Sequence, residues 1–206
     1  MLYKSHPWHG ISPGSKVPEE IICFIEVVPG DQMKYEIDKE SGYLKVDRPN
    51  LNSSVVPLLY GFIPQSLSDD YSAALCMKET NRSGLIGDGD PLDVIILTDR
   101  TIPRGDIILE AIPIGGIRMI DQNETDDKII AVLKSDQTYG SYQDIEDVPE
   151  KLLKRIRHYF STYKEDPDLS LTTNEKVQLL ETYNKACAHQ VIAAALQDYQ
   201  LKFKKS

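Results

Sequence analysis

Cysteine is scarce in this sequence. Only Cys23, Cys76 and Cys187 occur among 206 residues, and they lie far apart along the chain. An odd number of widely spaced cysteines favours neither a disulfide framework nor a zinc site built from cysteine pairs. We therefore expect three reduced thiols buried in the core, where free cysteine is often found.

Long apolar runs are also lacking. The longest, such as Ile129–Leu133, are far shorter than the roughly 18 residues that a membrane-spanning helix requires. The first residues, Met1–Pro7, include no apolar segment of the kind that a secretory signal carries. These absences predict a cytoplasmic protein that does not enter the membrane.

Basic residues are too few to balance the acids. Lys and Arg together number 23 against 32 Asp and Glu, which gives a formal net charge of -9. Nucleic acid and anionic membrane surfaces are therefore unfavourable partners, whereas cations are favoured. Nucleotide-binding loops are missing as well, because Gly115–Gly116 lacks the spacing of dinucleotide-binding and P-loop motifs.

The chain does contain a series of short β-strand patterns. With 41% hydrophobic and 27% charged residues, its length suits a single domain spanning 1–206. Ile21–Val28 is apolar and β-branched, and Lys34–Ile37 with Tyr43–Asp47 alternates as a β-hairpin does. Further strands are expected at Val94–Leu97, Ile107–Ile114, Gly116–Ile120 and Ile129–Leu133. Short strands in quick succession predict a barrel or a sandwich.

Two helical patterns follow the strands. One helix is predicted to begin near Pro149, with Asp147 as its cap, and the other around Asn184. Residues 65–86, by contrast, are mostly polar or small. We expect them to form a long inserted loop.

The densest chemical signal is a run of acids directly before an apolar strand, with Asp88, Asp90 and Asp93 inside six positions. Carboxylates this close repel each other unless they are protonated, exposed to solvent or bound to a hard divalent cation. An exposed acidic turn is the alternative. The spacing does not match an EF-hand, which requires glycine where this chain has Asp93.

A second acidic cluster, residues 121–128, lies between two predicted strands. If the two clusters meet at one end of a barrel, their carboxylates can hold more than one Mg²⁺. Neither cluster contains His or Cys, so the donors favour magnesium or manganese over zinc. Lys34 and Glu36 share one face of the hairpin, with Arg48 at its end. That face is either a solvated surface or a place where metal-binding and phosphate-binding groups meet.

The acidic run Asp88-Gly89-Asp90-Pro91-Leu92-Asp93 resembles the signature of soluble family I inorganic pyrophosphatases. Similar segments follow in the family's order at Ile25–Val27, Lys34–Lys39, Val46–Arg48, Tyr60–Phe62, Asp121, Asp126–Lys128 and Tyr163–Lys164. The resemblance extends from about Ile21 to Lys164. An ordered set of this kind is far more specific than one acidic loop.

The resemblance implies a fold and a reaction. The fold would be α+β but mainly β, a five-stranded OB-like closed barrel with flanking α-helices. The reaction would be Mg²⁺-dependent hydrolysis of inorganic pyrophosphate to two orthophosphates, by in-line attack of a metal-activated water or hydroxide. Several Mg²⁺ ions are implied, with Mn²⁺ as a substitute. Related enzymes are commonly homo-oligomers, either dimers or hexamers.

The resemblance also implies roles for individual residues, carried over by matching position. Metal binding falls to Asp88, Asp93, Asp121, Asp126, Glu36 and Glu26. Phosphate binding falls to Lys34, Arg48, Tyr163 and Lys164. Asp90 would orient or deprotonate the attacking water, with Tyr60 nearby and hydrogen-bonded to Asp90. Lys128 would brace the acidic cluster from behind the metal ligands, and the segment His6–His9 would only pack.

Two positions depart from the family pattern. Val56 stands where many members have tyrosine, which removes one hydroxyl on the phosphate side. Gln122 stands where an acid often follows the residue matched by Asp121, which removes one charge near the metals.

Two other kinds of function remain as alternatives. The first is an OB-like module that binds an oligonucleotide without catalysis. Such a module needs a basic groove with stacking aromatic residues, which an acid-rich face disfavours. The second is a protein that binds divalent cations without turnover, which leaves Asp90 and Lys34 unexplained.

Overall fold

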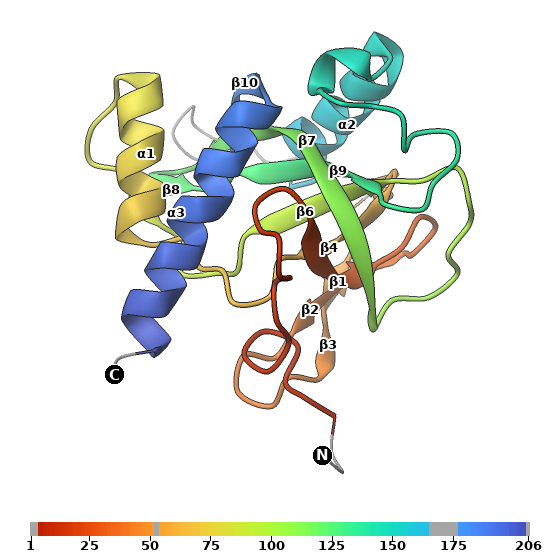
Figure 1. The fold of residues 1–206 in the computed structure, drawn as a ribbon, viewed down its shortest axis with the longest axis horizontal. Helices are drawn as coiled ribbons and strands as arrows, with labels where there is room; N and C mark the ends of the chain where they lie inside the picture. Colours follow the sequence, from red (N-terminus) through yellow and green to blue (C-terminus); the bar gives the residue numbers. More distant parts are fainter. Residues whose placement is uncertain (1–3, 52–53, 165–176, 205–206) are drawn as a thin grey trace.

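The computed structural model describes residues 4–51, 54–164 and 177–204, whose elements are arranged as Figure 1 shows. The strands of this part are β1 Ile21–Val27, β2 Met33–Ile37, β3 Leu44–Pro49, β4 Leu59–Phe62, β5 Ile86–Gly87, β6 Asp93–Leu97, β7 Ile107–Asp121, β8 Glu124–Thr125, β9 Lys128–Leu133 and β10 Val177–Asn184. Its helices are α1 Asp70–Thr80, α2 Glu150–Thr162 and α3 Lys185–Phe203, with a 3₁₀ helix, η1, at Ile145–Asp147.

Five strands close into a ring in the order β1–β4–β6–β9–β7, because β7 pairs with both β9 and β1. The pairs are antiparallel except for β6 and β9, which run parallel. The β2–β3 hairpin forms a separate two-stranded sheet. The prediction of a mainly β, OB-like fold with flanking helices is confirmed.

Strands β6 and β9 bury both of their faces. Val94 and Ile96 pack with Ala195 of α3 on one side, whereas Ile95 and Leu97 pack with residues of α2 on the other. Burial on both faces is typical of parallel pairs and explains why these strands read as unbroken apolar runs. Each buried Ile or Val contributes about 1.5–3 kcal/mol, so this pair anchors the ring.

Strand β7 is continuous over 15 residues, where two separate strands were predicted. Its register against β9 shifts between Pro113 and Gly115. Proline has no N–H to give to the ladder, and an irregularity at this point accommodates it. A Cβ at Gly115 would lie 2.5 Å from the Tyr183 carbonyl oxygen of β10, so glycine allows the close approach of that strand. Pro113 and Gly115 thus make the strand pairing irregular without ending the strand.

Helices α2 and α3 begin where they are predicted to begin, but the cap proposed for α2 is wrong. Pro149 is the residue before α2 and makes no side-chain cap. The Asp147 carboxylate instead accepts hydrogen bonds from the N–H groups of Gln143 (2.7 Å) and Asp144 (3.2 Å), within the turn of η1. At α3, the Asn184 side chain accepts a hydrogen bond from the Cys187 N–H at 3.0 Å, which is a regular cap.

Residues 65–86 contain helix α1, where an inserted loop was predicted. Figure 1 shows α1 lying beside α3. Its buried side chains include only Ala73 and Cys76, so its sequence shows no broad apolar stripe. The Asp69 side chain makes no cap at its amino end. The helix therefore depends on contacts with α3 that local sequence does not reveal.

The cysteine prediction is correct for two positions. Cys23 and Cys76 are buried, whereas Cys187 is only half-buried, and all three are free thiols. Cys187 lies near the beginning of α3, where the Arg118 guanidinium donates to its sulfur at 3.3 Å. As for membranes, none of the described helices combines the length and the apolar character needed to cross one.

Candidate active site

The thirteen residues that the sequence assigns to a site all line one cleft of about 550 Å³. They come from strands β1 to β4, the loop before β6 and the first residue of β6, the end of β7, the turn before β9 and the first residue of β9, and the residues after α2. The two acidic clusters, remote in sequence, therefore meet at one end of the ring. The prediction that they meet is confirmed by this geometry.

Lys128 lies at the floor of the cleft. In the parallel β6–β9 pair its backbone stands opposite that of Asp93. Its side chain is only 2% exposed, and its ammonium group contacts both the Asp93 and the Asp126 carboxylates. Burial opposes the charge on Lys128, but these carboxylates outweigh burial and raise its pKa well above the usual value. Lys128 therefore stays protonated and holds two acids together.

Asp88 and Asp90 flank a tight turn in the loop before β6. Gly89 has a φ of +74°, a conformation that glycine adopts without strain. The Asp90 N–H donates to the Asp88 carboxylate at 2.9 Å, and the Asp90 carbonyl accepts from the Ser68 N–H at 2.8 Å. Burial and the neighbouring Asp126 raise the pKa of Asp88 to about 8. The charged form of the Asp88 carboxyl group is therefore disfavoured unless a cation compensates it.

Glu26 is the carboxylate that interrupts the apolar strand β1. Its side chain accepts a hydrogen bond from the Ile37 N–H at 2.7 Å, and the residue is 6% exposed. Burial and repulsion by Asp93 raise the pKa of Glu26 to about 8, against the effect of that hydrogen bond. Within the described ranges, no basic side chain forms an ion pair with Glu26 or Asp88.

Basic side chains gather on the wall made by the β2–β3 hairpin. Lys34 and Arg48 stand opposite each other across the hairpin. The Lys34 ammonium lies 3.0 Å from the Asp47 carboxylate and 3.3 Å from that of Glu36. Burial opposes the charge on Lys34, but Asp47 outweighs it and raises the Lys34 pKa.

The opposite wall follows the end of α2. Lys164 pairs with Asp121, and burial raises the pKa of its neighbour Tyr163. Both groups face the cleft from the residues directly after the helix. Cationic groups thus approach the acids from two sides.

The predicted hydrogen bond between Tyr60 and Asp90 is wrong. The Tyr60 hydroxyl donates to the Asp93 carboxylate at 2.5 Å. Tyr60 stands opposite Ile95 in the β4–β6 pair, so Asp93 is its diagonal neighbour on the same face. Asp90 lies outside this strand pair, in the preceding loop. Strand register, which the sequence does not reveal, decides the partner.

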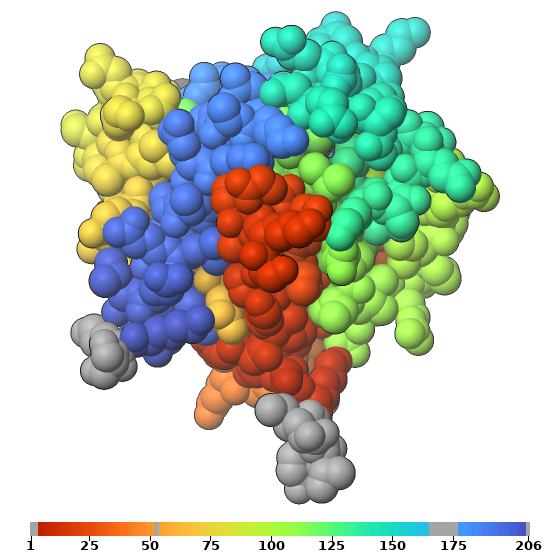
Figure 2. Space-filling model, viewed as in Figure 1, coloured from red at the N-terminus to blue at the C-terminus, as the bar shows by residue number. Residues whose placement is uncertain are grey.

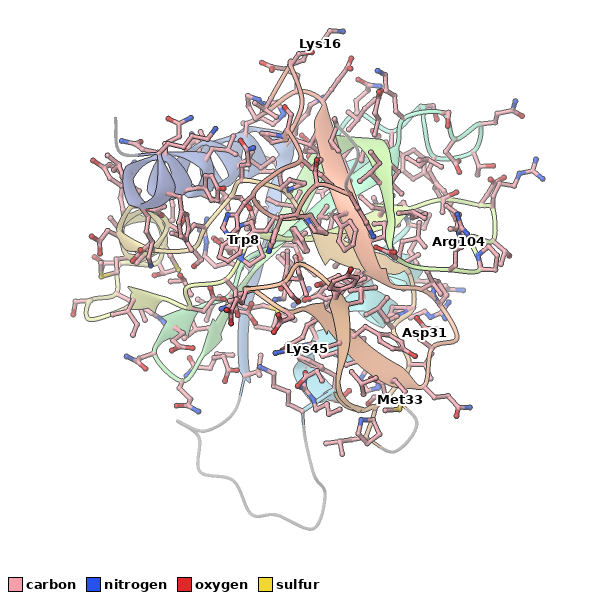
Figure 3. All side chains as sticks on the ribbon, turned by 90° about the horizontal axis from the view of Figure 1, so that it is seen from below. Trp8, Lys16, Asp31, Met33, Lys45 and Arg104 are labelled. Carbon is pink, nitrogen blue, oxygen red and sulfur yellow. The ribbon has the colours of Figure 1, made fainter. Side chains whose placement is uncertain are left out.

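Five charged residues of the cleft were not assigned to the site from sequence: Asp38, Lys39, Glu40, Lys45 and Glu124. Lys39 pairs with Asp90, and Lys45, which projects from the hairpin in Figure 3, lies 3.2 Å from the Glu36 carboxylate. Strand alternation places Lys45 on the same face as Asp47, so Lys45 could have been predicted as a cleft residue from sequence. Lys39 lies in a turn, where no periodicity indicates direction.

The two departures from the family pattern have clear places. Val56 is 2% exposed and lines a small cavity beside Tyr60, Tyr159 and Tyr163. Gln122 is exposed in the turn between β7 and β8, with a φ of +58°. Glu124, two residues further on, supplies an acid to the cleft.

Carboxylates outnumber cationic side chains in the cleft by ten to six. In the described parts of the chain, no three acids converge closely enough to hold one metal ion, because lysines lie between them. The donors are nevertheless of the right chemistry, since hard dications prefer carboxylate oxygens. The raised pKa values of Asp88 and Glu26 mean that their charged forms are disfavoured, and a bound cation would favour those forms. The residues therefore fit Mg²⁺ or a similar ion.

Several known proteins are similar to this chain in sequence, in fold or in both. The sequence model of a family described as inorganic pyrophosphatase matches residues 23–200. An inorganic pyrophosphatase of Chlamydia muridarum is 45% identical over 195 residues, which cover 94% of this chain and 93% of that protein. A soluble inorganic pyrophosphatase of Oryza sativa subsp. indica is 38% identical over 171 residues, or 83% of this chain and 71% of that protein. The crystal structure of the inorganic pyrophosphatase from Thermus thermophilus matches with a TM-score of 0.78 at 30% identity, covering 95% of this chain and 99% of that one.

Proposed function

This chain belongs to the inorganic pyrophosphatase family, and we propose that it hydrolyses inorganic pyrophosphate to two orthophosphates with several Mg²⁺ ions as cofactors. One observation carries this proposal. Two acidic clusters from distant parts of the sequence and a set of basic side chains line the same cleft. A site for a highly charged anion and its metal ions needs both kinds of group.

Six carboxylates of the cleft are assigned to the metal ions: Asp88, Asp93, Asp121, Asp126, Glu36 and Glu26. Because acids outnumber bases ten to six, an anionic substrate binds favourably only when additional positive charge enters the cleft. Mg²⁺ held by these carboxylates would supply that charge and would lower the pKa of a coordinated water towards neutrality. Lys128 pairs with both Asp93 and Asp126 and would keep them oriented into the cleft.

Lys34, Arg48, Tyr163 and Lys164 are assigned to the phosphates. The three cationic groups now pair with Asp47, Glu36 or Asp121. Exchange of these carboxylates for phosphate oxygens would keep every charge paired. Arg48 can contact two oxygens at once, whereas the lysines act as point charges. These groups stabilise the charge that grows on the departing phosphate.

Asp90 is assigned to the attacking water, which it would orient and deprotonate. Its side chain is 52% exposed and faces the cleft. In-line attack on one phosphorus needs little further chemistry from the protein beyond this proton transfer. Tyr60 would act beside it through Asp93, the carboxylate to which its hydroxyl donates.

We further propose that Mg²⁺ is preferred, with Mn²⁺ as a substitute, and that the chain acts as one domain spanning 1–206. The protein would work in the cytoplasm as a homo-oligomer, a dimer or a hexamer, on pyrophosphate and not on nucleic acid or membranes. The acidic cleft supports the exclusion of nucleic acid. The rice relative is described as soluble, which supports the proposed location.

The test is phosphate release from pyrophosphate with and without Mg²⁺, for the wild type, Asp90→Asn and Asp106→Asn. Asp106 is exposed, lies outside the cleft and has a φ of +58°, which asparagine tolerates, so its variant is a matched control. We expect metal-dependent turnover that falls by about 10²–10⁴-fold in Asp90→Asn and is kept in the control. A folded wild type that releases no phosphate at saturating Mg²⁺ would overturn the proposal.

A further inference from the structure

We propose that Lys39 and the N-terminal arm, defined as residues 6–9, form a positioning device for Asp90. The inference rests on the proposed function, in which Asp90 handles the attacking water. Neither element belongs to the assigned metal-binding or phosphate-binding groups. Both touch the loop that carries Asp90, directly or through one intermediate.

Lys39 makes the direct contact. It lies in the turn of the β2–β3 hairpin, and its ammonium group pairs with the Asp90 carboxylate. The same group donates to the Gly89 carbonyl at 3.3 Å. Lys39 thus holds both the side chain and the backbone of the loop. It links the hairpin to the loop before β6, and both segments line the cleft.

His6 holds the turn that carries Lys39. Its Nδ1 accepts hydrogen bonds from the N–H groups of Trp8 (3.2 Å) and His9 (3.3 Å). The ring proton therefore lies on Nε2, which donates to the Lys39 carbonyl at 3.2 Å. The ring also packs against Gly42, where an added Cβ would lie 2.8 Å from the His6 ring. The imidazole is thus fitted between the arm and the turn.

Trp8 is linked to the loop that carries Asp90 through Ser66. The residue is 3% exposed, and its label marks its place in Figure 3. Its indole N–H donates to the Ser66 carbonyl at 2.7 Å, and the Ser66 hydroxyl accepts from the Leu92 N–H at 2.8 Å. Leu92 follows Asp90 by two positions. The arm therefore holds the loop through Ser66 on one side and Lys39 on the other.

The arm itself is fixed to the fold. Figure 2 shows the N-terminal segment lying along the surface beside α3. The His9 ring lies 2.7 Å from the Tyr199 hydroxyl of α3, and the Gln65 N–H donates to the Trp8 carbonyl at 2.9 Å. An arm anchored in this way can transmit its position to the loop. The arm makes hydrogen bonds, and not only packing contacts, toward the Asp90 loop: one set passes through Lys39 and the other through Ser66.

The experiment compares five variants with the wild type: Lys39→Met, Lys39→Arg, His6→Asn, His6→Gln and Lys4→Met. Methionine keeps the stem of Lys39 without its charge, and arginine restores the charge. An asparagine amide imitates the Nδ1 acceptor of His6, whereas a glutamine amide imitates the Nε2 donor. Lys4 pairs with Asp106 outside the cleft, so Lys4→Met is the matched control.

We expect Lys39→Met and His6→Asn to lower kcat about tenfold or more, because misplacing a catalytic group slows the chemical step. KM should stay within about twofold of the wild-type value, since substrate binding is not the interaction removed. Lys39→Arg and His6→Gln should recover most of the loss. The Lys39 and Lys4 variants should unfold cooperatively, because exposed ion pairs contribute little to stability. The same unfolding measurement checks that the His6 variants are folded.

Hydrogen–deuterium exchange provides a readout that does not depend on activity. The amides of residues 88–92 should exchange faster in Lys39→Met and His6→Asn than in Lys4→Met. Wild-type exchange and kcat in both variants, with an active wild type, would overturn the positioning role alone. A wild type without any turnover would overturn the proposed function, and the exchange experiment would still test the link.

Discussion

The Asp198 carboxylate of α3 accepts hydrogen bonds from the N–H groups of Tyr71 (2.8 Å) and Ser72 (2.9 Å), at the amino end of α1. The Ser72 hydroxyl donates to the same carboxylate at 2.8 Å. Asp198 is buried, and a negative charge at this end is favourable for the helix dipole. Helix α1 therefore takes its cap from a residue 126 positions away in the chain.

Replacement of Asp198 by alanine should lower the free energy of unfolding by about 2–3 kcal/mol, because partly buried N–H donors lose a charged acceptor. Urea unfolding followed by circular dichroism measures this loss. Asp70→Ala, in the exposed first turn of the same helix, should cost only about 0.3–1 kcal/mol. Equal effects of the two substitutions would show that Asp198 is not the cap.

Asp136 should make stability depend on pH in acid. Burial opposes its charge, but hydrogen bonds from the N–H groups of Tyr139 (2.7 Å) and Asp99 (2.9 Å) lower the pKa of Asp136 to about 2, from 3.8. Because the folded pKa is below the unfolded value, the stabilisation is present above pH 4 and is lost as the pH falls towards about 2.

The variant Asp136→Asn lacks this titration. It should be less stable than the wild type by about 1–3 kcal/mol near neutral pH, and the gap should shrink between about pH 4 and 2. Urea titrations at a series of pH values measure the gap. A difference that stays constant down to pH 2.5 would contradict the assignment.

Mg²⁺ should stabilise the folded protein even without substrate. Binding to the native state alone adds about 2.7 kcal/mol when the free ion is at 100 times its Kd. Calorimetric scans with Mg²⁺ and with a chelator should therefore give different Tm values. Asp126→Asn should reduce the shift, whereas Asp106→Asn should keep it. A Tm that Mg²⁺ leaves unchanged would count against the metal assignment.

Lys34→Ala and Arg48→Ala should impair substrate binding more than folding. Both side chains are partly exposed on the hairpin, so we expect stability losses within about 1 kcal/mol. KM for pyrophosphate should rise about tenfold or more, because a charge-assisted phosphate contact contributes about 1.5–3 kcal/mol. Steady-state kinetics and urea midpoints separate the two effects. Lys151→Ala, exposed on α2, is the control.

The sequence predicts the strands whose burial leaves a regular pattern. β1, β6 and β9 are mostly apolar along their length, and the β2–β3 hairpin alternates polar and apolar residues. β4 was missed because it has only four residues, one of them Gly61. A Cβ at Gly61 would lie 1.9 Å from the Phe24 carbonyl oxygen, so the residue that weakens the strand pattern is required by the pairing with β1.

Elements that depend on distant partners could not be predicted. The cap of α1 comes from α3, and its two buried side chains give no periodic signal. The continuity of β7 depends on a register shift at Pro113 that neighbouring strands accommodate. The strand β10 was not predicted either, and it pairs along the second half of β7.

For the candidate site, residue types and order were informative, whereas pairing was not. The family resemblance identified acids and bases that do line one cleft. The partner of Tyr60 and the position of Lys39 depend on strand register and turn geometry. Strand register and turn geometry depend on the three-dimensional arrangement of several segments and cannot be predicted from the sequence of one segment.

The parallel pairing of β6 with β9 places Asp93 and Lys128 in the backbone hydrogen-bond ladder that also carries the core. The bottom of the cleft is thus not a separate loop that can melt on its own. Heat should abolish turnover and tertiary structure over the same few degrees, and a compact but inactive form should not accumulate on warming.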